Sequence, residues 1–341
     1  MTFMIWGVST VMTVSSAFRR LLVSGELRAV RAQLLMLAIA TLAFAPLLAL
    51  GEAFGRPLSG AIAPFGVAMF FGALLFGIGM QLGGGCGSGT LYALGGGSPR
   101  MLLVLIAFCA GGFRASLDLG AWQSLPEWAP LALGERFGWG MAAGAQALVL
   151  ITAAYALRRY DKAAPAGGND HSWRGPWPLL AAILLLPLLN LATLLLAGHP
   201  WTITWAFTLW AAKAAQALGW NPADDPYWSA PFQSDALASG ILSDVTSVMD
   251  IGLVLGAARA AMLVRRFAPI WRIQLRSLAA AILGGLAMGY GARLAYGCNI
   301  GAFVSGVAST SLHGWLWIVA ALIGSWIGVR LRPLFGLANH A

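Results

Sequence analysis

Charged side chains are scarce in this sequence, and their scarcity excludes an ordinary soluble protein. Only 10% of the 341 residues are Asp, Glu, Lys or Arg, whereas soluble domains contain about 25%. Hydrophobic residues make up 59% of the chain, and its mean hydropathy is +0.77. The apolar runs are continuous and do not alternate with polar residues, which excludes a transmembrane β-barrel. We therefore predict an all-α polytopic membrane protein.

Cysteine and histidine are also rare, which argues against a disulfide framework or a metal centre. The three cysteines, Cys86, Cys109 and Cys298, form no CxxC pair, and the chain has four histidines. We expect no cofactor and no metal. The N-terminus lacks the basic segment of a cleavable signal peptide. The net charge of +9 comes mostly from arginines in short loops, which indicates cytoplasmic loops and not nucleic-acid binding.

The apolar runs predict about nine transmembrane helices. Residues 158–177 form a polar linker that we expect on the cytoplasmic side, together with the arginine-rich residues 259–276. An even number of spans must separate these two segments, so residues 200–235 are expected to be a re-entrant hairpin from the outside. The first run is short for a full span. The expected spans are 3–14, 32–50, 65–82, 100–113, 137–157, 178–197, 236–260, 278–295 and 312–330.

A glycine-rich stretch with one thiol follows the third expected span. It reads Gly-Gly-Gly-Cys-Gly-Ser-Gly-Thr-Leu-Tyr at 83–92. Each glycine costs about 1 kcal/mol relative to alanine in a helix interior, so this stretch should break the helix. A break at membrane depth is tolerated only where protein or a water-filled cavity surrounds it. The stretch is therefore a candidate functional site.

A similar Gly-Cys motif occurs around Cys298, which indicates an internal repeat. Aligning Cys86 with Cys298 also matches a series of glycines without a gap. The expected topology gives the two copies opposite directions in the membrane, as in transporters built from inverted repeats. The halves are then 1–157 and 178–341, joined by the linker 158–177. The matched pairs are Gly72 with Gly284, Gly77 with Gly289, Gly79 with Gly291, Gly85 with Gly297 and Gly89 with Gly301.

After each break we expect the N-terminus of a half-helix, at 87–91 and at 299–303. Free backbone N–H groups and the helix dipole favour an anion at such a terminus. The implied ligand is a small anion that meets one thiol from each repeat.

The motifs at 83–92 and 296–302 resemble those of the YeeE/YedE family of bacterial sulfur-compound transporters. The resemblance covers most of the chain. It implies an inverted-repeat inner-membrane protein with re-entrant Gly-Cys loops that passes thiosulfate along a narrow path of cysteines, through weak S–H hydrogen bonds. It also implies a small cytoplasmic sulfur-carrier protein as a partner. By motif, Cys86 and Cys298 correspond to two of the thiols in that path.

The N-terminal region departs from the family pattern. Residues 15–19 match the end of a loop that carries a third cysteine in the family, and Thr13 occupies the cysteine position. Cys109 does not restore the pattern, and we interpret it as a structural thiol. The expected substrate path therefore contains Thr13, Arg293 and the residues of the two breaks. Those residues are Gly85, Cys86, Gly87, Ser88, Gly89, Thr90, Gly297, Cys298, Asn299 and Gly301.

Three further charged residues near the expected path have more than one interpretation. For Lys213 we prefer an interfacial side chain of the expected hairpin that extends towards water over a residue of the substrate site. Asp244 and Asp250 could carry a coupling proton or pair with arginines, but satisfaction of a helix end is the preferred interpretation.

The leading hypothesis is an inner-membrane importer of thiosulfate or a related small sulfur oxyanion, and not an enzyme. Transport of another chalcogen species, such as a selenium compound or sulfite, remains open because Thr13 replaces a thiol. A membrane thiol–disulfide protein is a further alternative, although neither Cys86 nor Cys298 has a resolving neighbour.

Overall fold

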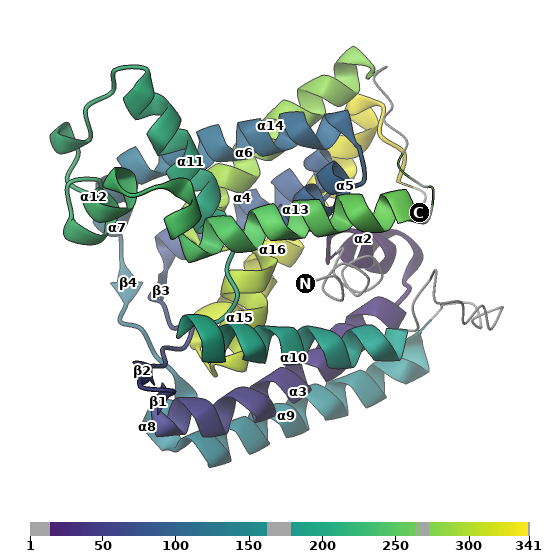
Figure 1. Cartoon of the computed structure of the whole chain (residues 1–341). Coiled ribbons are helices and arrows are strands. Elements are labelled where there is room, and N and C mark those ends of the chain that lie inside the picture. Colours follow the sequence, from purple (N-terminus) through teal and green to yellow (C-terminus); the bar gives the residue numbers. More distant parts are fainter. Residues whose placement is uncertain (1–13, 162–178, 264, 266, 268–272, 340–341) are drawn as a thin grey trace.

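The protein is a helical bundle in the computed structural model, which describes residues 14–161, 179–263, 265, 267 and 273–339 (Figure 1). The α-helices are α2 (Val14–Ser24), α3 (Arg28–Leu50), α4 (Val67–Gly83), α5 (Gly87–Gly95), α6 (Pro99–Leu117), α7 (Leu119–Gln123), α8 (Leu133–Phe137), α9 (Trp139–Ala156), α10 (Leu179–Ala197), α11 (Thr204–Ala217), α12 (Pro231–Ala238), α13 (Val245–Leu263), α14 (Leu275–Leu294), α15 (Ser305–Ala308) and α16 (Leu312–Leu331).

Short 3₁₀ turns, one π-helix and two small two-stranded sheets complete the fold. The 3₁₀ turns are η1 (Leu157–Tyr160), η2 (Pro222–Asp224), η3 (Ile241–Ser243) and η5 (Arg332–Phe335), and the π-helix is η4 (Asn299–Val304). Strand β1 (Glu52–Ala53) pairs with β2 (Arg56–Pro57), and β3 (Phe65–Gly66) pairs with β4 (Glu127–Trp128), both antiparallel.

Seven helical segments in the described part of the chain are long and apolar enough to cross a membrane, and an eighth apolar helix, Ala181–Ala197, is shorter. The protein is thus an all-α multi-pass membrane protein, as predicted. The first expected span, 3–14, and most of the linker, 162–177, lie outside the described residues. The seven segments are Arg28–Leu50, Val67–Gly95, Pro99–Leu117, Trp139–Tyr160, Val245–Leu263, Leu275–Ala308 and Leu312–Phe335.

The seventh predicted helix, 236–260, was wrong at its start. The chain forms the short helix α12, turns at Ser239 and Gly240, and begins α13 only at Val245. Lys213 on α11 fixes this turn, because its Nζ donates to the carbonyl oxygens of Leu237 and Ser239 at 2.7 and 2.6 Å. Ser239 and Gly240 are a local turn signal, but the prediction extended one helix through them.

The centre of the bundle consists of α4, α6, α14 and α16, while α3, α9 and α10 form a separate layer beside it (Figure 1). Arginines gather at one end of the bundle, among them Arg19 and Arg20 on α2, Arg158 and Arg159 in η1, and Arg332 in η5. We call this the arginine-rich end. The opposite end carries both two-stranded sheets and the short helices α7, α8 and α12.

Glycines let α4 and α14 approach each other backbone to backbone. A Cβ atom placed on Gly72 would lie 2.7 Å from the carbonyl oxygen of Gly291, and one on Gly79 would lie 2.6 Å from that of Gly284. Only glycine fits at such crossings. In the sequence repeat, Gly72 matches Gly284 and Gly79 matches Gly291. Gly72 therefore contacts the counterpart of Gly79, and Gly79 contacts the counterpart of Gly72. A two-fold relation between the two helices produces this pattern.

The outer pairs of the central helices show the same correspondence. On α4, a Cβ on Gly77 would lie 2.9 Å from the backbone nitrogen of Ser325 on α16. On α14, a Cβ on Gly289 would lie 2.7 Å from the backbone nitrogen of Gly112 on α6. Gly77 and Gly289 are matched by the repeat, so α4 meets α16 much as α14 meets α6.

Candidate functional site

Both central helices break where the sequence places its Gly-Cys motifs. Helix α4 ends at Gly83, Gly84 adopts a left-handed conformation (φ +86°), and α5 begins at Gly87. Helix α14 ends at Leu294, Gly297 has φ +145°, and η4 begins at Asn299. Glycine is the residue that adopts such positive φ values at little cost. Cys86 and Cys298 are thus the residues directly before the two new helices, as the half-helix prediction required.

The two breaks meet in the interior of the protein. A Cβ atom on Gly87 would lie 3.5 Å from the Cys298 sulfur, so the backbone of one break packs against the thiol of the other. Both cysteines are only 1% exposed, and neither forms a disulfide. The structure therefore brings the two predicted thiols into one buried site.

Backbone N–H groups surround each sulfur. Those of Ser88 and Gly89 point to the Cys86 sulfur, and those of Ile300 and Gly301 point to the Cys298 sulfur. The Ser88 hydroxyl oxygen lies 3.4 Å from the Cys86 sulfur. The first N–H groups of a helix have no partner inside the helix, so each break offers donors to a group that occupies the site.

Three buried polar atoms at the breaks have no hydrogen-bond partner among the described residues. They are the hydroxyl oxygen of Thr90 and both side-chain polar atoms of Asn299. Thr90 is fully buried, and Asn299 is 1% exposed. Buried polar groups in native proteins nearly always have a partner. These atoms are therefore available to a bound ion or to water.

A segment that the sequence did not indicate covers both breaks. A Cβ on Gly87 would lie 3.6 Å from a methyl carbon of Ile203, and a Cβ on Gly301 would lie 3.2 Å from the hydroxyl oxygen of Thr202. Asn190 on α10 holds the segment, because its Oδ1 accepts the backbone N–H of Trp201 at 2.8 Å. Its Nδ2 donates to the Ser305 hydroxyl oxygen at 3.2 Å. In the sequence, Asn190 is one polar residue within the apolar run 178–197, and nothing there indicates this role.

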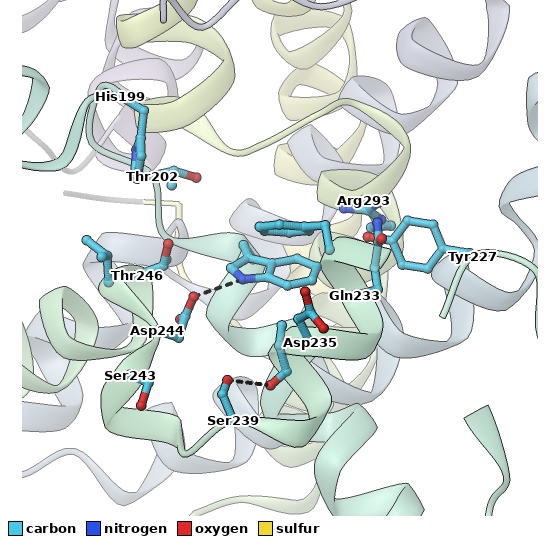
Figure 2. A pocket seen from close by; sticks show the side chains of 14 residues that line it. His199, Thr202, Tyr227, Gln233, Asp235, Ser239, Ser243, Asp244, Thr246 and Arg293 are labelled. Carbon is cyan, nitrogen blue, oxygen red and sulfur yellow. Dashed lines mark hydrogen bonds between the residues drawn. The ribbon is translucent and has the colours of Figure 1, made fainter. Parts of the chain in front are cut away.

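Arg293 lines a cavity of about 760 Å³ together with residues of α12, which lies at the end of the bundle opposite the arginine-rich end (Figure 1, Figure 2). Its guanidinium carbon is 4.4 Å from the centre of the Tyr227 ring, and its buried Nε has no hydrogen-bond partner among the described residues. Thr202 and the first residues of α13 also line this cavity. Since Thr202 contacts both the cavity and Gly301, the cavity adjoins the breaks.

The sequence also matches a known protein family over residues 9–327, and that family is described as sulphur transport. The chain belongs to the sulphur transport family.

Individual relatives agree with the family match. The chain is 33% identical to the probable transporter YedE of Escherichia coli over 171 residues, which cover 48% of this chain and 41% of that protein. It is 25% identical to the thiosulfate transporter TsuA of Spirochaeta thermophila over 282 residues, which cover 76% of each chain. The matched region thus spans about two fifths of the length of YedE.

Two aspartates of this family member differ sharply in their surroundings. Asp244 precedes α13 and satisfies its first turn, because its Oδ2 accepts the backbone N–H of Ser247 at 2.7 Å. Its Oδ1 accepts the indole N–H of Trp205 at 3.0 Å (Figure 2). The helix-end prediction is confirmed for Asp244. It was wrong for Asp250, which lies inside α13 and is fully buried, and neither of its carboxylate oxygens has a hydrogen-bond partner in the described part of the chain.

The arginine-rich end closes the other side of the first break. Arg100 donates to the carbonyl oxygens of Leu82, at 2.8 Å, and Gly83. Arg332 donates to the carbonyl oxygen of Gln81 at 2.6 Å. These bonds satisfy the free carbonyl groups at the end of α4. Burial, with the adjacent charge of Arg20, lowers the pKa of Arg19 on the neighbouring α2.

Two sequence predictions concern residues away from this site. Thr13, which replaces the third cysteine of the family pattern, lies outside the described residues. Cys109 on α6 is a free, partly buried thiol that packs against the main hydrophobic core. It belongs to neither break.

Proposed function

We propose that this protein imports thiosulfate, or a related small sulfur oxyanion, across the bacterial inner membrane. The observation that carries the proposal is the meeting of two Gly-Cys breaks, where Gly87 packs against the Cys298 sulfur. The similarity to a protein named as a thiosulfate transporter supports the choice of anion.

The chemistry of the site is suited to weak, reversible binding of a soft anion. A doubly charged anion loses its hydration at membrane depth, so protein groups must replace the lost water. The N–H groups and hydroxyls of the breaks provide hydrogen bonds, and neutral thiols are weak donors. Conduction requires binding that is favourable but weak enough for release. A thiolate would repel the anion, so the transporting form holds neutral thiols.

The proposed path crosses the bundle from one end to the other. The anion enters the cavity that contains Arg293, passes Cys298 and Cys86, and leaves near Arg100 and Arg332. We assign the arginine-rich end to the cytoplasm because cytoplasmic loops carry an excess of Arg and Lys. A small sulfur-carrier protein would accept the sulfur compound at that end.

The halves 1–157 and 178–341 are proposed to be inverted repeats that each contribute one break. The reciprocal contacts of Gly72 with Gly291 and of Gly79 with Gly284 support this arrangement. Inverted-repeat transporters place their substrate site between the two repeats, and the two thiols lie at such a position.

Complementation of growth tests the proposal. A bacterial host without its own thiosulfate uptake should grow on thiosulfate as the sole sulfur source when it expresses this protein. Cys86→Ala and Cys298→Ala should each abolish growth, while Cys109→Ala should preserve it. Growth with both alanines in place would refute the role of the thiols. Rescue on sulfite or on a selenium compound, without rescue on thiosulfate, would change the substrate to another chalcogen species.

A further inference from the structure

Asp250 is a buried acid that the proposed path leaves unexplained. It lies one helical turn before Val254 on α13, and residues four apart share a helix face. Val254 and Ala257 contact Gly95 of α5, since a Cβ on Gly95 would lie 2.6 Å from that of Ala257. Asp250 therefore belongs to the face of α13 that covers the half-helix after Cys86.

The charged and titratable neighbours of Asp250 include no cation among the described residues. Asp244 lies within its electrostatic reach, and so do the sulfurs of Cys109 and Cys298. Lys213 on α11 is committed to the carbonyl oxygens of the turn that precedes η3. Tyr92 on α5 packs further along α13, against Ala257 and Ala260.

A carboxylate in this position would be an unpaired charge in a membrane interior, which is strongly unfavourable. The neutral acid avoids that charge, yet its O–H and C=O groups have no partner among the described residues. Since buried polar groups are normally satisfied, these groups are available to a ligand of the path. An O–H donor close to Cys298 is suited to an anion oxygen.

The cavity that contains Arg293 reaches α13 one helical turn before Asp250. Thr246 lines that cavity and precedes Asp250 by four residues, so the two lie on the same face of α13. The cavity in turn meets Ser243 and Asp244 at the start of the helix.

We propose that Asp250 is the proton site of this transporter and that its proton accompanies the anion across the membrane. A proton from the outer solution forms an O–H bond with a carboxylate oxygen of Asp250, and the neutral acid donates a hydrogen bond to the anion. After the anion leaves, the O–H bond breaks and the proton is released on the cytoplasmic side. No electrons are exchanged. This inference rests on the proposed function and adds its energy source.

Uptake into proteoliposomes tests the coupling. The purified protein is reconstituted, the membrane potential is held at zero, and radiolabelled thiosulfate is supplied outside. An inside-alkaline pH difference of about one unit should raise the accumulation ratio roughly tenfold for each coupled proton. Asp250→Asn, which mimics the neutral acid, should still exchange labelled for unlabelled thiosulfate but lose this response. Asp250→Glu, which can still titrate, should retain a response to pH.

Asp224→Asn is the matched control, because Asp224 is an exposed loop residue that bonds only to Asn221 and its own turn. It should respond to the pH difference as the unaltered protein does. The proposal is overturned if thiosulfate accumulation in the unaltered protein ignores the pH difference, or if Asp250→Asn retains the full response.

Infrared spectroscopy separates this proposal from the proposed function. Protein grown with isotope-labelled aspartate should show the carbonyl stretch of a protonated aspartic acid at neutral pH, and Asp250→Asn should lack that band. If the unaltered protein carries no thiosulfate, the proposed function fails, and the band alone decides for or against the proton site. Absence of any band that depends on Asp250 overturns the proposal whatever the transport result.

Discussion

Replacing Gly289 by alanine should destabilise the protein, because it forces two central helices apart. The new Cβ would lie 2.7 Å from the backbone nitrogen of Gly112 and would clash with the carbonyl oxygen of Phe108. Favourable contacts lie at about 3.5–4.0 Å, so α6 and α14 must separate by about 1 Å. Overpacking of this kind costs about 1–3 kcal/mol, and alanine regains at most about 1 kcal/mol of helix propensity.

Thermal unfolding of the purified protein in detergent measures the effect. A net loss of about 1–2 kcal/mol should lower the midpoint by about 2–8 °C. Gly77→Ala should behave alike, since Gly77 makes the matching contact on α4. Gly144→Ala on α9 is the control: its Cβ would meet nothing within 4 Å, so its midpoint should stay or rise. A Gly289→Ala variant that melts at or above the unaltered protein would refute the reasoning.

Three further substitutions probe the cavity and the segments around it. Arg293→Gln should raise the KM for anion uptake roughly tenfold, because a charged hydrogen-bond donor contributes about 1.5–3 kcal/mol; initial rates over a substrate series measure this, and an unchanged KM would contradict it. Lys213→Met should lower the unfolding midpoint, since it removes the donor that fixes the turn at Ser239; a midpoint equal to that of the unaltered protein would count against this. Trp228→Phe should cost about 1 kcal/mol, because the buried indole N–H donates to the Ser116 hydroxyl oxygen at 2.8 Å; equal denaturant stability would argue against that bond.

The sequence predicted the helical breaks well, because glycine leaves a strong local signal. A helix must end where Gly84 and Gly297 take positive φ values, and no tertiary information is needed to expect that. The sequence repeat predicted that Cys86 and Cys298 belong to one site, and the structure places the Gly87 backbone against the Cys298 sulfur.

Other parts of the site depend on contacts between distant segments, which one sequence does not reveal. Asn190 resembles any polar interruption of an apolar helix until its bond to Trp201 is known. Asp244 and Asp250 are six residues apart on one polar stretch, yet one satisfies a helix start and the other has no partner. Tertiary packing buries Asp250 completely, and residues near it in the sequence do not encode that burial.

The turn between α12 and α13 illustrates the same limit for the fold. The prediction from local composition was a single helix over 236–260. In the structure, the ammonium group of Lys213 donates hydrogen bonds to the carbonyl oxygens of Leu237 and Ser239, where that helix is interrupted. A charge on another helix thus decides where α13 begins, and with it which residues face the cavity.

The glycine crossings of α4 with α14 also have a mechanical consequence. Where two helices touch through their backbones, no side chain can change rotamer to let one slide past the other, so the crossing resists shear. Gly72 and Gly79 both make such backbone contacts with α14. We therefore expect α4 and α14 to move together as one rigid unit. We expect opening and closing of the route to involve segments outside this crossing, such as Trp201–Ile203, which Asn190 and Ser305 hold through side-chain hydrogen bonds to the backbone of Trp201 and not through a helical interface.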